Sequence, residues 1–212
     1  MKKHLMIPVI DNGLGLSRSS WALSLAAACL GHLRNFDVTL TSISYPYCDG
    51  ALNIATQDFL ESDCDEMLVI DTDVIFTNQH LEWLFSHDAP LVYGLYPKKK
   101  LGLEFPCVPL ESDPQPFAED GRGPLREVAR VARGFMRVHR SVFEGLKPHV
   151  KKIVCAETGR DQWVFWKPLD GGHSEDFAFC DLYRSHGGKV LVDSRICAQH
   201  EGSAVYPIKG TY

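Results

Sequence analysis

The sequence has no apolar run long enough to cross a membrane. A spanning helix needs about 20 apolar residues, and the helix-like apolar stretch at residues 21–30 falls well short of that. Near the start of the chain, an apolar run follows two lysines but is broken by Pro8 and Asp11, whereas a signal peptide needs a longer continuous stretch. We therefore expect a soluble protein without a signal peptide or a membrane span.

Paired cysteines are also missing. The seven cysteines are scattered, odd in number and never spaced as CxxC, which argues against both a zinc knuckle and a disulfide framework. Reduced and mostly buried thiols are typical of a cytoplasmic protein, and the cytoplasm is the location that we expect.

Basic residues are fewer than acidic ones. The 22 Lys and Arg residues against 27 Asp and Glu residues give a formal net charge of −5. A nucleic-acid-binding domain of this size is usually basic, so we expect no nucleic-acid partner. An anionic ligand stays compatible with this composition, because a divalent metal ion can locally reverse the sign of an acidic site.

What the sequence does contain is an alternation of strand-like and helix-like segments. With 212 residues, 45% of them hydrophobic, and neither a repeat nor a linker, the chain fits one α/β domain. This alternation predicts a mostly parallel, doubly wound, Rossmann-like sheet with flanking helices. The expected strands are residues 4–10, 37–44, 66–71 and 90–95, and the expected helices are 18–32, 50–62 and 78–87, with N-caps at Ser17, Asp49 and Asn78.

The second half of the chain is less regular. Residues 96–124 are rich in proline and hold a run of three lysines, which predicts a loop or hairpin over the ligand-binding face. Residues 125–131 and 134–139 look like short strands, and we expect a small additional antiparallel element beside the main sheet. We then expect a brief helix at 141–147, irregular chain at 155–173, a helix from Ser174 to Gly187–Gly188, and a last strand at 189–193.

The clearest chemical signal is a pair of carboxylates at the end of a buried strand. In the segment EMLVIDTDVIF, Asp71 and Asp73 follow an apolar run. Residues two apart in an extended chain point the same way, so both carboxylates should converge at the carboxyl end of a central strand, where open α/β sheets bind ligands. Two carboxylates so close repel each other unless a cation lies between them. Oxygen ligands suit Mg²⁺ or Mn²⁺. The alternative is an acid pair that only caps the next turn.

Two further segments carry candidate functional groups. Glu175 and Asp176 open a helix in GGHSEDF, where the helix dipole should keep Asp176 ionised at neutral pH and able to deprotonate a hydroxyl. His200 follows the last strand in ICAQHEGS and can complete a metal site as a neutral imidazole. Taken alone, each segment is also compatible with a simpler interpretation, a favourable helix start and an ordinary loop histidine.

In this order, the segments resemble the GT-A fold of nucleotide-sugar-dependent glycosyltransferases, and in particular its compact bacterial and viral members. The resemblance covers nearly the whole chain, from the first strand–loop–helix through the DxD, the Gly-containing segment 133–136 and the xED pair to the C-terminal His. It implies a glycosyltransferase that needs Mn²⁺ or Mg²⁺. The donor would be a UDP- or GDP-sugar, and the acceptor a saccharide, a lipid-linked group or a protein.

The resemblance also implies roles for individual residues. Asp73 and His200 would bind the metal directly, Asp71 would contact the ribose or the metal through water, and Asp176 would be the general base of an inverting reaction. Within one domain, residues 1–95 would form the nucleotide-binding half and residues 96–212 the acceptor-side half. Further positions are implied near the donor, at Pro8, Ile43, Tyr45, Asn53 and Gly134, and near the sugar or acceptor, at Glu175, Trp163 and Trp166.

Three other interpretations compete with this one. A phosphohydrolase of the haloacid dehalogenase type also has a DxD after an apolar strand, but usually with Thr or Val at the position of Ile75 and with that strand near the start of the domain. A nucleotidyltransferase should have a phosphate loop rich in Gly and in Arg or Lys after the first strand, where this chain has only Gly13, Gly15 and Arg18. A sugar-binding module without activity would not need the intact acids and histidine.

Overall fold

The computed structural model describes residues 2–11, 18–100, 103–117, 123–156, 158–168, 174–202 and 205–206. None of the described helices combines the length and the apolar character that a membrane crossing requires. The first half contains β1 (His4–Asp11), α1 (Ser19–Leu30), the 3-10 helix η1 (His32–Asn35), β2 (Asp37–Ser44), α2 (Cys48–Glu61), β3 (Glu66–Ile70), β4 (Val74–Ile75), α3 (Asn78–Phe85) and β5 (Leu91–Leu95). The second half contains β6 (Cys107–Pro109), β7 (Leu125–Val131), β8 (Phe135–His139), α4 (Arg140–Leu146), η2 (Lys147–His149), β9 (Lys152–Val154), β10 (Asp161–Trp163), α5 (Glu175–Ser185), β11 (Leu191–Cys197), β12 (Gln199–Glu201) and β13 (Val205–Tyr206).

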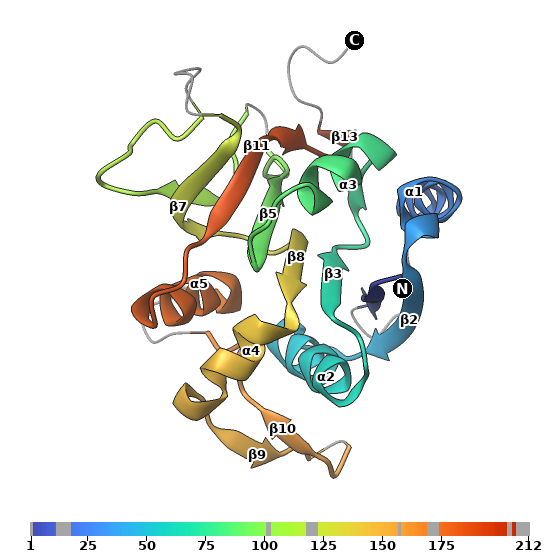
Figure 1. The fold of residues 1–212 in the computed structure, drawn as a ribbon, viewed down its shortest axis with the longest axis vertical. Coiled ribbons are helices and arrows are strands. Elements are labelled where there is room, and N and C mark those ends of the chain that lie inside the picture. Colours follow the sequence, from blue (N-terminus) through green and yellow to red (C-terminus); the bar gives the residue numbers. More distant parts are fainter. Residues whose placement is uncertain are drawn as a thin grey trace.

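A mixed sheet of eight strands crosses the molecule in the order β2-β1-β3-β8-β5-β11-β7-β6 (Figure 1). β1 pairs in parallel with β2 and β3, and β5 pairs in parallel with β11. β8 runs antiparallel between β3 and β5, and β7 runs antiparallel between β11 and β6. All strands of this sheet except β7 and β8 therefore point the same way. Smaller antiparallel sheets join β9 to β10 and β4 to β12 and β13, so the predicted α/β class with an additional antiparallel element is confirmed.

Helices cover both faces of the main sheet. Side chains alternate between these faces along each strand, so one strand contributes to two cores. In β3, Met67 and Val69 point into a core shared with α2, α4 and α5. Leu68 and Ile70 point into the opposite core, which is shared with α1 and α3. A strand that is buried on both faces has a continuous apolar sequence, and this is why β3 could be located without the structure.

The helices begin close to the predicted positions, but their capping residues differ in part. Ser174 caps α5 as predicted. Thr77 caps α3 in place of Asn78, and Asp49 lies in the first turn of α2 and not at its N-cap. Several short polar residues near a helix start can serve as its cap, so apolar spacing alone does not identify the one that does. The predicted cap Ser17 lies outside the described residues.

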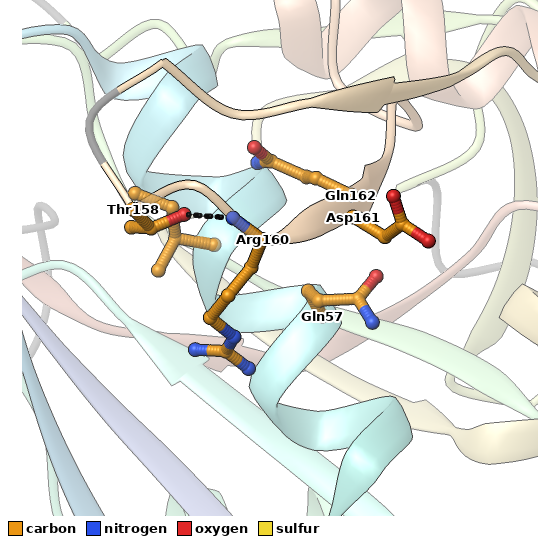
Figure 2. A pocket seen from close by; sticks show the side chains of 6 residues that line it. Gln57, Thr158, Arg160, Asp161 and Gln162 are labelled. Carbon is orange, nitrogen blue, oxygen red and sulfur yellow. Dashed lines mark hydrogen bonds between the residues drawn. The ribbon is translucent and has the colours of Figure 1, made fainter.

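The hairpin of β9 and β10 is held against α2 by polar contacts. Arg160 donates to Asp58 at 2.9 Å and also to Glu61, both on α2. The Arg160 N–H donates to the Thr158 hydroxyl at 3.3 Å, as Figure 2 shows. A small pocket lies at this contact, and it contains none of the candidate site residues. It is lined by Ile54, Gln57, Thr158, Arg160, Asp161 and Gln162.

Candidate active site

The candidate residues gather at the edge of the main sheet where β3 ends. Asp71 follows β3 directly, and its N–H donates to the carbonyl of Gly134 at 3.0 Å. Because β8 runs antiparallel to β3, the start of β8 lies at this edge and brings Arg133 and Gly134 beside Asp71. Residues from distant parts of the sequence therefore meet at the carboxyl end of the central strand.

The chain turns immediately after Asp71. The N–H of Val74 donates to the Asp71 carbonyl at 2.9 Å, and β4 then pairs with β12, which places His200 opposite Val74. The N–H of Glu201 donates to the Asp73 carbonyl at 2.7 Å. Because of this turn the carboxylates of Asp71 and Asp73 have different partners, so the expected extended geometry does not describe this segment.

Asp73 is paired with His200 and Lys99. His200 Nε2 lies 3.4 Å from Asp73 Oδ1, and Lys99 Nζ donates to Asp73 Oδ2. His200 Nδ1 lies 2.8 Å from the carbonyl oxygen of Pro97. That oxygen can only accept, so Nδ1 carries the hydrogen and Nε2 is the atom that faces Asp73. Burial opposes the ionisation of Asp73, but the hydrogen bonds from His200 and Lys99 outweigh it and lower its pKa to about 2.

This arrangement fits a divalent cation held by Asp73 and His200. The hydrogen bond from Nε2 to Asp73 requires a protonated His200. In the neutral form Nε2 is an acceptor, so two acceptors then face each other across 3.4 Å and a cation between them would satisfy both. Metal-binding histidines usually donate their other N–H to a carbonyl or carboxylate, as His200 does to Pro97. Within the described part of the chain, no three His, Cys, Asp or Glu side chains are placed to hold a metal. The protein would thus supply two ligands, and substrate oxygens or water the others.

Arg133 connects Asp71 with Asp176. Its guanidinium donates through Nη1 to Asp71 Oδ1, and its Nε lies 3.4 Å from Asp176 Oδ1. Nη2 donates to the Cys48 thiol at the start of α2. The Arg133 side chain is only 7% exposed and that of Asp176 only 15%. A largely buried guanidinium therefore couples the end of β3 to the first turn of α5.

Asp176 lies in an unusual environment for an acid at a helix start. Its Oδ1 is buried and lacks a hydrogen-bond partner among the described residues. Burial raises the pKa of Asp176 to about 7, since the opposing effect of Arg133 is smaller and the charges of Glu175 and Asp71 add to the rise. A pKa of about 7 leaves Asp176 only partly ionised at neutral pH, and not fully ionised as the helix dipole alone would predict, because desolvation outweighs the dipole. A carboxyl whose pKa lies near the working pH is well suited to proton transfer.

Gly134 lies where no side chain fits. A Cβ at this position would lie 2.5 Å from Tyr96 Oη and 2.6 Å from Asp71 Oδ2. The Gly134 N–H donates to Tyr96 Oη at 3.1 Å, and the Tyr96 ring packs edge-on against the His200 ring, with centroids 5.0 Å apart. The glycine therefore allows Tyr96 to contact both sides of the site.

Three predicted donor residues lie in or just after β1 and β2. Pro8 is buried within β1, where it pairs with Thr41 of β2. Ile43 is buried and packs with Ala51 and Ala55 of α2. Tyr45 follows β2 and is partly exposed. None of these contacts involves Asp71 or Asp73, so the nucleotide-base site implied by the resemblance stays a prediction.

Asn53 and Trp166 form a structural unit within the fold. Asn53 Nδ2 donates to the Trp166 carbonyl at 2.7 Å, and its Oδ1 accepts the Trp166 N–H at 3.0 Å. Trp166 is fully buried and stacks on Phe179 with ring centroids 4.1 Å apart. Trp163 is partly buried, with Lys152 Nζ 5.7 Å from its ring centroid. Trp166 thus presents no exposed ring face to a sugar, and the Asn53 amide is used within the fold.

Three residues of the site had no role assigned from the sequence, namely Arg133, Lys99 and Tyr96. Arg133 precedes an apolar strand, which is a common pattern on a protein surface. Lys99 belongs to a run of three lysines, which usually indicates a solvated loop. Tyr96 continues the apolar run of β5. Only their tertiary contacts distinguish these three residues from other Arg, Lys and Tyr residues of the chain.

Comparisons with known proteins bear on the fold. No protein-family model and no curated protein matches the sequence. The crystal structure of A197 from STIV aligns with a TM-score of 0.55 at 20% identity, over 95% of this chain and 86% of that chain. The crystal structure of GalNAc-T7 with UDP, GalNAc and Mn²⁺ aligns with a TM-score of 0.60 at 12% identity. That alignment covers 99% of this chain and 45% of that chain, so this chain spans less than half of the GalNAc-T7 chain. At these identities, the alignments show a shared GT-A-like α/β fold.

Proposed function

We propose that this protein is a metal-dependent glycosyltransferase that moves a sugar from a nucleotide-diphosphate-sugar to an acceptor hydroxyl. The observation that carries this proposal is the pairing of Asp73 with His200 at the carboxyl edge of the sheet. GalNAc-T7, which shares the fold, was solved with UDP, GalNAc and Mn²⁺. A UDP-sugar and Mn²⁺ are therefore the first donor and cofactor to test, with GDP-sugars and Mg²⁺ next.

On the donor side, Asp73 and His200 would hold the divalent cation. When bound, the cation would neutralise the diphosphate of the donor and so assist its departure as a leaving group. Asp73 is suited to this role because an aspartate carboxylate is ionised at physiological pH. Pro97 fixes the imidazole of His200 from the opposite ring nitrogen, so Nε2 stays directed at Asp73.

On the acceptor side, Asp176 would take the proton of the attacking hydroxyl. With its pKa raised to about 7, it is a stronger base than an ordinary aspartate and is partly ionised at neutral pH. Arg133 binds both Asp176 and Asp71, so it would fix the distance between the base and the donor side. Direct displacement by a hydroxyl that Asp176 activates would invert the anomeric configuration.

The two sides of the reaction would be divided largely along the chain, with His200 as the contribution of the second half to the donor side. Residues 1–95 would bind the nucleotide, since they supply Asp71 and Asp73 at the end of β3. Residues 96–212 would bind the acceptor, since they supply Asp176, with Glu175 and the partly buried Trp163 as further candidates. The acceptor would be a saccharide, a lipid-linked group or a protein.

A screen of nucleotide-sugars tests this function. The purified chain is incubated with UDP- and GDP-sugars, with and without Mn²⁺, and the release of nucleoside diphosphate is measured. We expect release from at least one donor only with the metal, and its loss in Asp73→Asn. Asp63→Asn, which alters an aspartate that is 82% exposed, is the matched control. Release of phosphate from simple phosphate esters through an aspartyl-phosphate would support the phosphohydrolase instead.

A further inference from the structure

Three consecutive lysines follow β5, and Glu104 holds two of them away from the third. The ammonium groups of Lys98 and Lys100 each contact one oxygen of the Glu104 carboxylate. The Lys98 N–H also donates to the Glu104 carbonyl at 2.7 Å, and the Lys100 N–H donates to the Lys98 carbonyl at 2.8 Å. Lys99, the middle lysine, instead places its Nζ on Asp73 Oδ2. This segment is therefore anchored on both sides of a lysine that binds the site.

Lys99 and His200 between them occupy both oxygens of Asp73. His200 Nε2 faces Oδ1 and Lys99 Nζ contacts Oδ2. Like charges in contact repel strongly in a partly buried site, so the Lys99 ammonium would compete with any divalent cation for this carboxylate. The Lys99 side chain is 37% exposed, which leaves its long stem room to move while the neighbouring lysines keep the backbone in place.

We propose that Lys99 is an exchangeable counter-ion of Asp73. It neutralises Asp73 in the free protein, gives up this carboxylate when a divalent cation binds, and then contacts the diphosphate of the donor. The inference rests on the proposed function, because that function places a diphosphate beside the cation as its remaining ligand. An ammonium released from Asp73 stays within a side chain's reach of those phosphate oxygens. Lysine suits this exchange, since it is a compact charge with three donors on a flexible stem.

The proposal predicts two opposite effects for Lys99→Met, which removes the ammonium and keeps most of the stem. Without nucleotide, Mn²⁺ should bind about three- to tenfold more tightly, because an internal competing charge is gone. At saturating Mn²⁺, UDP should bind about tenfold more weakly, because a charge-assisted contact to the diphosphate is lost. A lysine with a purely structural role would not move the two affinities in opposite directions.

Calorimetric titration with MnCl₂ alone, and then with UDP at saturating Mn²⁺, measures both affinities. Lys189→Met is the matched control, since it removes the same charge from a lysine that is 70% exposed and pairs with Glu127. We expect this control to keep both affinities within about twofold of the wild type, because Lys189 pairs with Glu127 and not with Asp73. Thermal melting checks that each variant is folded.

The outcomes separate this inference from the function on which it rests. Unchanged or weaker Mn²⁺ binding in Lys99→Met, unchanged UDP binding, or equal effects of Lys99→Met and Lys189→Met would each overturn the role of Lys99 alone. Mn²⁺ binding that survives unchanged in Asp73→Asn, or a wild type that binds no Mn²⁺ with UDP present, would overturn the proposed metal site together with the inference.

Discussion

Replacing Asp176 with Asn would separate the chemical role of this residue from its cost to the folded state. The substitution keeps the size of the side chain and removes its charge. An ordinary Asp has a pKa of about 3.9, and burial raises that of Asp176 to about 7, a difference of about three units. At 1.36 kcal/mol per unit, the ionised carboxylate destabilises the fold by up to about 4 kcal/mol. Water and Arg133 can reorganise around the charge, so we expect about 2 kcal/mol.

The sign of this effect depends on pH. Below about pH 4, Asp176 is protonated in both the folded and the unfolded chain, so no cost arises. Between about pH 4 and 7 the unfolded chain loses this proton first, so the free energy of unfolding of the wild type falls as the pH rises. Above about pH 7 the cost stays constant. The stability gained by Asp176→Asn should therefore grow from near zero at about pH 4 to about 2 kcal/mol at about pH 8, or about 4–8 °C in Tm.

The same variant should lose activity. Removal of a general base typically lowers turnover by about 10²- to 10⁴-fold, whereas the affinity for the donor should change little. In the wild type, kcat/KM should rise up to about pH 7 and then level off, as Asp176 ionises. Calorimetric melting at several pH values and steady-state kinetics measure both effects.

Asp161→Asn, in the β9–β10 hairpin, is the control for Asp176→Asn, because its side chain is 61% exposed. It should show neither the pH-dependent stabilisation nor the loss of turnover. A Tm difference between Asp176→Asn and the wild type that does not change with pH would refute the burial argument. Turnover within about threefold of the wild type, or retention at the anomeric carbon, would refute the role as base.

Three further substitutions test other parts of the site and the fold. His200→Gln should weaken Mn²⁺ and donor binding together by about 10- to 100-fold, and unchanged affinities in calorimetry would argue against a metal ligand. Gly134→Ala should abolish transfer and destabilise by about 1–3 kcal/mol, because its Cβ would meet Tyr96 and Asp71. Wild-type activity in this variant would show that the close approach is unimportant. Arg140→Ala should cost about 2–4 kcal/mol in urea denaturation, because the guanidinium binds several carbonyl oxygens at and just beyond the C-terminal end of α2. A loss below about 0.5 kcal/mol would contradict that capping role.

The helices and the longer strands could be predicted from the sequence. Short strands such as β10, which lies in the stretch expected to be irregular, and the neighbours of each strand in the sheet could not. β3 and β5 are buried on both faces, so each is a continuous apolar run that stands out in the sequence. β8 separates them and runs antiparallel to both. Hydrophobic periodicity indicates whether a side chain is buried, but not which strand lies beside it. The pairing of β3 with β8, a strand from the second half, therefore could not be predicted from the sequence.

In the candidate site, too, some features could be predicted from the sequence and others could not. The order of the segments singled out Asp73 and His200, which the structure places side by side. The extended geometry assumed for Asp71 fails because the chain turns at residues 72–73. The raised pKa of Asp176 depends on burial by other elements, and the position of Lys99 depends on how Glu104 binds its neighbours. Such tertiary effects leave no periodic trace in the sequence.

The most direct test concerns the proposed cation site at Asp73 and His200. Anomalous diffraction at the manganese absorption edge, from a crystal grown with UDP and Mn²⁺, locates the metal without assumptions about its ligands. We predict one anomalous peak between the Asp73 carboxylate and His200 Nε2, in contact with oxygens of the diphosphate. UDP bound in the crystal without an anomalous peak at these two residues would contradict the proposed metal-dependent transfer.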